Sequence, residues 1–224
     1  MNKKSLLLKI LVRMVLSVVV FGLMLFWPAG TFSYTAGWIY LGVVYSFMLV
    51  MTSYFFKHDP ALLERRMQMK EKEAEQKLLI KLASLIYLCG FFLPGFDYRY
   101  GWSEVPMELI IAANAVVMVG LIIVFWVFKA NSYAARTIEV FDGQELVSTG
   151  PYAIVRHPMY TGVQLMLLAT PIALGSYWML IPFALSPLFF YFRIKNEEKV
   201  LCEQLDGYLQ YREEVRYRMF PYIW

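Results

Sequence analysis

The sequence has few of the residues on which metal enzymes and secreted domains depend. It contains two cysteines, Cys89 and Cys202, no Cys-x-x-Cys pair, and two histidines, His58 and His157. These numbers exclude a disulfide framework and argue against zinc, so we expect no metal site. Charged residues make up 17% of the chain and hydrophobic residues 59%, whereas soluble domains carry roughly 25% charged residues. The shortage of charge predicts a membrane protein.

Long apolar runs predict an all-α integral membrane protein with about five to six membrane-embedded helices, including a C-terminal helical hairpin. The first run is too long for the core of a signal peptide, so we interpret it as a retained helix. The expected spans are Leu6–Trp27, Ala36–Phe56, Leu78–Phe96 and Val105–Phe128, followed by a shorter pair at Tyr160–Leu174 and Tyr177–Phe192.

The basic residues are divided unevenly between the two sides of these spans. With the N-terminus inside, 20 of the 21 Lys and Arg residues fall on inner segments, and only Arg99 falls outside. The positive-inside rule therefore places both termini in the cytoplasm, and we expect a bacterial-type inner (plasma) membrane. The basic residues are spread over several loops rather than gathered on one face, which argues against nucleic acid as a partner.

Residues 1–128 are interpreted as a transmembrane scaffold of about four helices. A charged cytoplasmic segment at 57–77 interrupts it, and Asp59-Pro60 is typical of a helix N-cap followed by proline at the first helical position. We expect an amphipathic helix there, either as a solvated connector or as the lining of a substrate entrance. Asn114, within the fourth span, is expected to hydrogen-bond to another helix rather than to a ligand.

Residues 129–224 are interpreted as the catalytic region. They comprise a polar connector with a turn signal at Asp142-Gly143, a membrane hairpin at 159–193 and a polar, aromatic tail. The first arm, Tyr160–Leu174, has 15 residues and is about 22 Å long as a helix, shorter than a bilayer core of roughly 30 Å. A turn at Gly175-Ser176 returns the chain to the face from which it came.

The hairpin therefore brings two polar clusters together at the cytoplasmic face. One is the run from Gly150 to Gly162, which contains Arg156 and His157; the other is Arg193 to Glu198. Carboxylates and tyrosine rings both attract cations, so a sulfonium or ammonium group suits such a site. Plainer explanations also exist: Arg156-His157 as a topological anchor, Glu197-Glu198 as a solvated helix start, and tail arginines at lipid headgroups.

The residues in this region resemble those of the isoprenylcysteine carboxyl methyltransferase family, and the related phospholipid N-methyltransferases are similar. The resemblance rests on Gly-Pro-Tyr-x-x-Val-Arg-His-Pro-Met-Tyr from Gly150, Arg-x-x-x-Glu-Glu from Arg193, and a Tyr-x-x-Tyr…Arg…Phe-Pro ending, and it covers about Asn131–Pro221. It implies a membrane enzyme that uses S-adenosyl-L-methionine. The absence of a G-x-G-x-x-G motif after a strand agrees with this and argues against a soluble-type methyltransferase.

The resemblance also implies which residues form the site. Arg193 and Glu197 are expected to be catalytic. The residues expected to bind the cofactor are Gln144, Leu146, Gly150, Tyr152, Val155, Arg156, His157, Pro158, Tyr160 and Glu198. If the methyl acceptor is a carboxylate, Arg193 orients it; if it is an amine, Glu197 takes the proton. The acceptor is expected to be a lipid or another lipophilic molecule that enters from the bilayer.

Two other functions are weighed against methyl transfer. A sterol-type membrane reductase would need a basic cluster for the 2′-phosphate of NADPH, and no extra cluster is committed to one. A small transporter or lipid-binding scaffold would place charges within the first four spans, where Glu108 near an outer end is the main example. The sequence favours the methyltransferase and determines neither its acceptor nor its oligomeric state.

Overall fold

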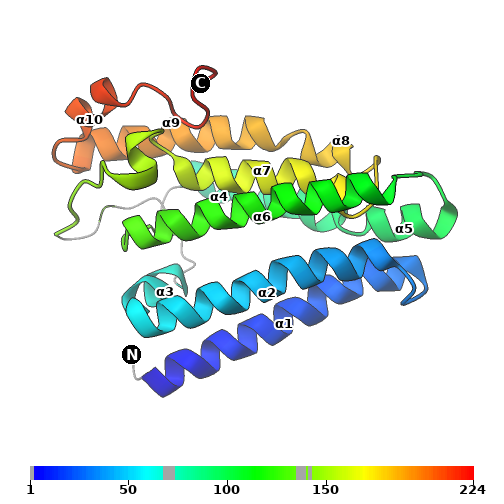
Figure 1. Cartoon of the computed structure of the whole chain (residues 1–224). Coiled ribbons are helices and arrows are strands. Elements are labelled where there is room, and N and C mark those ends of the chain that lie inside the picture. Colours follow the sequence, from blue (N-terminus) through cyan, green and yellow to red (C-terminus); the bar gives the residue numbers. More distant parts are fainter. Residues whose placement is uncertain (1–2, 68–73, 135–139, 141–142) are drawn as a thin grey trace.

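The computed structural model describes residues 3–67, 74–134, 140 and 143–224. The described residues form helices and no strand, which confirms the predicted all-α class (Figure 1). The first half contains α1 (Lys3–Ala29), α2 (Thr35–His58), α3 (Pro60–Met67), α4 (Ala74–Gly90), α5 (Leu93–Tyr100) and α6 (Met107–Ala130). The second half contains the 3-10 helix η1 (Gly150–Ala153), α7 (Pro158–Ala173), α8 (Leu180–Phe183), α9 (Ser186–Gln204) and α10 (Tyr208–Glu214).

Four stretches of the described chain are long and apolar enough to cross a membrane. They are Lys3–Ala29, Thr35–His58, Lys77–Tyr100 and Met107–Ala130, and they correspond to the four predicted spans. Trp27 in the last turn of α1, Trp102 just after α5 and Trp178 just before α8 are exposed, and these ends of α1, α5 and α8 lie at one end of the bundle (Figure 1). Aromatic side chains are enriched at membrane interfaces, so this end has the character of an interface belt.

The predicted third span, Leu78–Phe96, is not a single helix. Helix α4 ends at Gly90 and α5 begins at Leu93, with Pro94 in its first turn. In a continuous helix Pro94 would lack the N–H that bonds to Gly90 O, and its ring would clash with that carbonyl group, so the chain breaks after Gly90 and starts a new helix. The apolar run is as predicted, but Pro94 divides it.

The C-terminal hairpin has its turn where predicted and a more complex return arm. Gly175 takes a positive φ of 70°, a backbone conformation that glycine adopts without strain. The predicted arm Tyr177–Phe192 is divided into α8 and α9, with Pro187 in the first turn of α9. Helix α9 then continues past Phe192 to Gln204. Arg193, Glu197 and Glu198 therefore all lie on one helix.

Helices α6 and α7 approach each other closely through two glycines. A Cβ atom added to Gly162 would lie 2.7 Å from the carbonyl oxygen of Gly120, and one added to Gly120 would lie 2.6 Å from that of Gly162. Small residues permit such backbone contact between membrane helices. Near the other end of the pair, Asn114 Nδ2 donates to Ala173 O over 3.2 Å, which confirms the predicted interhelical bond.

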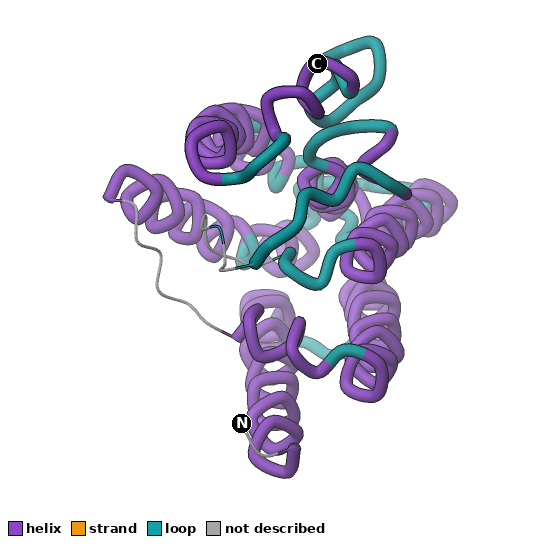
Figure 2. Tube along the Cα trace, turned by 90° about the vertical axis from the view of Figure 1, so that its left-hand side faces the viewer, coloured by secondary structure: helices purple, strands orange, loops and turns teal. Residues whose placement is uncertain are grey.

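The end of the bundle that carries α3 collects the loops and the tail. Asp59 Oδ1 accepts a hydrogen bond from Leu62 N over 3.1 Å, which confirms the predicted N-cap of α3. Residues 68–73 of the predicted amphipathic segment lie outside the described residues, as do 135–139 and 141–142 of the connector. Figure 2, viewed along the helices, shows the connector and tail loops crossing this end.

Candidate functional site

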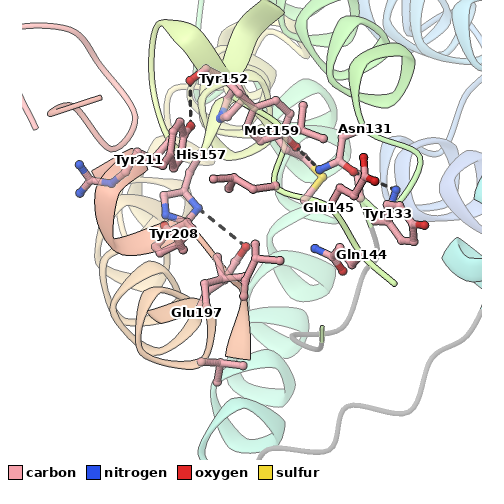
Figure 3. Close-up of a pocket in the computed structure, with 18 of the residues that line it drawn as sticks. Asn131, Tyr133, Gln144, Glu145, Tyr152, His157, Met159, Glu197, Tyr208 and Tyr211 are labelled. Carbon is pink, nitrogen blue, oxygen red and sulfur yellow. Dashed lines mark hydrogen bonds and ion pairs between the residues drawn. The ribbon is translucent and has the colours of Figure 1, made fainter. Parts of the chain in front are cut away.

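Arg156 and His157 lie between η1 and the start of α7. Pro158 is in the first turn of α7, where its missing N–H costs no hydrogen bond. His157 is the N-cap residue of α7, but its side chain makes no capping bond. The imidazole is therefore not committed to the end of its own helix, and in Figure 3 it projects toward Glu197.

Glu198 of α9 is buried between two arginines. Its Oε1 lies 2.7 Å from Arg156 Nε, and its Oε2 lies 2.9 Å from Arg218 Nε. Burial alone would raise the pKa of this carboxyl group, but hydrogen bonding to His157, Arg156 and Arg218 outweighs burial and lowers the pKa from 4.5 to about 2. Glu198 is therefore ionised near neutral pH, and its carboxylate holds the side chains of Arg156 and Arg218 together.

The C-terminal tail is fixed to the same place by backbone contacts. Arg156 Nη1 donates to the carbonyl oxygens of Val215, at 2.7 Å, and Arg216, at 2.8 Å. The backbone N–H groups of Arg156 and His157 donate to Tyr217 O and Arg218 O over 2.9 and 2.8 Å. Residues far apart in the sequence thus form one wall.

Tyr160 connects the two residues that the sequence identifies as catalytic. Its hydroxyl accepts a hydrogen bond from Arg193 Nε over 2.8 Å and donates one to Glu197 Oε2 over 2.5 Å. The other carboxylate oxygen of Glu197 lies 3.8 Å from His157 Nδ1. The four-residue spacing predicted that Arg193 and Glu197 lie on one face of a helix. In the structure, Tyr160 of the first arm of the hairpin connects them.

Two tyrosines of α10 close the cavity on the side of the tail. Tyr211 donates through its hydroxyl to Tyr152 O over 2.8 Å. Burial raises the pKa of both Tyr208 and Tyr211, and burial also raises the pKa of Tyr152 to about 12, so all three keep their phenolic protons near neutral pH. Tyr208 OH is buried without a hydrogen-bond partner in the described part of the chain, whereas His157 Nε2 lies 3.5 Å from Glu198 Oε1.

These walls surround a cavity with about 830 Å³ of empty space, part of it open to solvent (Figure 3). The sequence-predicted residues that line it are Gln144, Leu146, Tyr152, Arg156, His157, Pro158, Tyr160 and Glu197.

Four other predicted residues do not line the cavity. Glu198 is buried behind His157, Val155 is buried, and Gly150 faces Ala130 and Trp126. Arg193 does not line the cavity but donates to Tyr160, which does.

The predicted set of site residues did not include the rest of the lining, which is Asn131, Tyr133, Ala134, Glu145, Val147, Met159, Val200, Leu201, Leu205, Tyr208 and Tyr211. Tyr208 and Tyr211 belong to the polar, aromatic tail that the sequence places beside the site. Helical spacing could have predicted two of the other residues. Val200 and Leu201 follow Glu197 by three and four positions, so they lie on the same face of the helix. The contribution of Asn131 and Tyr133 depends on where the connector crosses the bundle, which no local pattern specifies.

A group of cavity contacts has the chemistry of a cation site. The Glu197 carboxylate and the rings of Tyr152, Tyr160 and Tyr208 all line the same space, and both kinds of group attract positive charge. No group of three or more His, Cys, Asp and Glu side chains suited to a metal occurs among the described residues.

The part of the chain that contains most of this site matches a known protein family. Residues 109–206 match the family model described as phospholipid methyltransferase, and this range contains His157, Glu197 and Glu198. The match confirms the resemblance predicted from the motifs and, with the four candidate spans, supports a membrane methyltransferase.

The solved structure of the eukaryotic intramembrane Ras methyltransferase, isoprenylcysteine carboxyl methyltransferase, is also similar. It shares 17% sequence identity, with 97% of this chain and 86% of that chain covered, at a TM-score of 0.49. No curated protein matched the chain.

Proposed function

We propose that this member of the phospholipid methyltransferase family transfers a methyl group from S-adenosyl-L-methionine to a lipophilic acceptor. The observation that carries the proposal is the cavity between η1, α7, α9 and α10, where Glu197 and several tyrosines face His157. It lies largely within the region that matches the family.

The residues present fit this methyl donor. A sulfonium requires negative or π-electron groups, which Glu197 and the tyrosine rings supply. An adenosine and an amino-acid moiety require hydrogen-bonding partners, and Tyr208, which lines the cavity, has a buried hydroxyl without one in the described chain. An unpaired buried polar atom is costly, so this hydroxyl is a natural contact for a polar ligand.

The donor supplies a methyl group already activated by positive sulfur, so the protein must align the reactants and exclude water. Gln144, Leu146, Tyr152, Arg156, His157, Pro158 and Tyr160 are proposed to hold the donor. Glu198 supports Arg156 and His157 from behind, and Gly150 and Val155 belong to the turn that leads to them. Arg156 and Glu198 also fix the tail that closes the cavity.

Glu197 is the proposed catalytic residue because its carboxylate lines the cavity. With an ammonium acceptor, Glu197 takes the proton before the nitrogen attacks the methyl carbon; with a carboxylate acceptor, no proton need be removed. Arg193 contacts Tyr160 and is proposed as a positioning residue that orients this hydroxyl and, through it, Glu197. The acceptor enters from the bilayer, and the site faces the cytoplasm.

A labelling experiment tests this function directly. Purified protein is incubated with a bacterial lipid extract and donor carrying a radioactive methyl group, and the label in the organic phase is counted. Label in lipid is expected with the wild type and with His58→Ala, which changes an exposed histidine, and strongly reduced label is expected with His157→Ala. Treatment with alkali then releases label from a methyl ester but not from an N-methyl group. No label in any lipid would refute the proposal.

A further inference from the structure

A second groove lies beside α1, away from the cavity beside His157 and Glu197, which we name the methyltransferase cavity. It has about 900 Å³ of empty space, part of it open, and we name it the α1–α2 groove. Its lining residues are Ile10, Arg13, Met14, Ser17, Met48, Met51, Thr52, Phe55, Leu63, Arg66, Met67 and Phe128, contributed by α1, α2, α3 and α6.

The lining is apolar and adaptable. Four of its residues are methionines: Met14, Met48, Met51 and Met67. Methionine side chains are flexible and polarisable, so they fit the changing shape of a flexible hydrocarbon chain. On α1, Leu8, Val12 and Val15 are exposed, which is the pattern of a helix whose outer surface contacts lipid. An acyl chain from the bilayer therefore suits the body of the groove.

The end of the groove beside α3 is basic. Arg13 and Arg66 line it, and its described lining holds no acidic side chain. Arg13 Nη1 donates to Met67 O over 3.3 Å, and the other N–H groups of a guanidinium provide further donors for an anion. Arginine pairs favourably with phosphate through two parallel hydrogen bonds. The groove thus presents positive charge at one end of an apolar channel.

The position of Arg13 matches the level of lipid headgroups. It lies 16 residues before the end of α1 at Ala29, which is about 24 Å along a helix. A long arginine side chain extends further toward the interface, so its head lies near the edge of a hydrocarbon core of roughly 30 Å. Phosphate groups lie at this depth, and cationic residues attract anionic lipids there.

The groove is separated from the methyltransferase cavity by side chains. The Arg66 guanidinium lies 4.3 Å from the ring centroid of Phe128, which is buried. Arg66 Nη1 also donates to Ala134 O over 3.0 Å and lies 3.7 Å from Met159 Sδ, and both Ala134 and Met159 line the cavity. Arg66 and Phe128 therefore separate a molecule bound in the groove from His157 and Glu197.

We infer that the α1–α2 groove binds one anionic phospholipid of the inner leaflet, with an acyl chain among the methionines and its phosphate at Arg13. This lipid is a bound partner and not the methyl acceptor. The inference does not depend on the proposed methyl transfer, because lipid retention is measured without the donor.

Native mass spectrometry tests the inference on the full chain. The protein is reconstituted in vesicles of equal parts phosphatidylglycerol and phosphatidylcholine, extracted in mild detergent, and its retained lipids are counted. One phosphatidylglycerol per chain is expected. Arg13→Gln should lower its retention about fivefold, as expected for the loss of one basic contact at a membrane surface. Thr52→Trp, which fills the groove and leaves both arginines, should also lower it.

Lys129→Gln is the matched control, because it removes one positive charge from an exposed residue outside the groove lining at the end of α6. It should retain lipid as the wild type does. Arg66 is left unchanged because it also contacts the wall of the methyltransferase cavity. Equal retention of both lipids, or unchanged retention in Arg13→Gln, would overturn the inference.

Discussion

Arg156 and Glu198, 42 positions apart in the sequence, form a buried ion pair in which Nε lies 2.7 Å from Oε1. The pair joins the start of α7 to α9, and Arg218 of the tail binds the other carboxylate oxygen. The three charges therefore hold the hairpin and the tail around the cavity.

Replacing Glu198 with Gln should destabilise the protein. The change leaves two guanidinium groups facing a neutral amide in a buried place, and breaking a buried ion pair costs about 3–5 kcal/mol. Thermal unfolding in detergent measures the effect. Glu203→Gln, which removes the same charge from an exposed position on α9, should change stability by less than about 0.5 kcal/mol. Equal melting temperatures for the two variants would contradict the structural role of Glu198.

The same carboxylate predicts a pH dependence in acid. Its pKa is lowered from 4.5 to about 2 in the folded protein, so the unfolded chain binds its proton more readily. The stabilisation is therefore fully present above about pH 4.5 and is lost as the pH falls toward 2. The difference in melting temperature between wild type and Glu198→Gln should shrink over this window. A constant difference from pH 6 to pH 2.5 would contradict the assigned pKa.

Tyr160→Phe should slow methyl transfer and leave donor binding nearly unchanged. The variant keeps the ring but removes the hydroxyl that accepts from Arg193 and donates to Glu197. We expect kcat to fall at least about tenfold, with a change of less than about threefold in donor affinity. Tyr191→Phe, on the return arm of the hairpin, is the control. A change in donor affinity with kcat preserved would place Tyr160 in donor binding alone.

Gly162→Ala should disturb the contact between α6 and α7. The new methyl group would lie 2.7 Å from Gly120 O, a backbone atom that moves only if the helices separate. Overpacking of this kind costs about 1–3 kcal/mol. At Gly42 of α2 an added Cβ has nothing within 4 Å, so Gly42→Ala should be neutral or stabilising by up to about 1 kcal/mol. Thermal unfolding of the two variants tests this: the melting temperature should fall for Gly162→Ala and should stay the same or rise for Gly42→Ala.

Local sequence signals predicted the features that depend on neighbouring residues. The Asp59 cap, the Asn114 bond to another helix and the turn at Gly175 are confirmed. Each follows from side-chain chemistry or backbone freedom at a known helical position. The break at Pro94 was also visible in the sequence, and the prediction of one helix through Leu78–Phe96 gave hydropathy too much weight.

The rest of the site depends on contacts between distant segments. The tail's backbone at Tyr217 and Arg218 binds Arg156 and His157, and no periodicity in either segment specifies this pairing. Tyr160 likewise comes from one arm of the hairpin, whereas Arg193 and Glu197 come from the other. The motifs identified the participating residues, but the partners of each became clear only from the packing of the helices.

The central claim is that the cavity beside His157 and Glu197 binds the methyl donor. Calorimetric titration with S-adenosylhomocysteine, the demethylated form of the donor, tests it most directly, with NADPH titrated in parallel. The account predicts that the wild type and His58→Ala bind S-adenosylhomocysteine and not NADPH, and that His157→Ala binds at least about tenfold more weakly while remaining folded. Failure of the folded wild type to bind S-adenosylhomocysteine, or unchanged affinity in His157→Ala, would contradict the account.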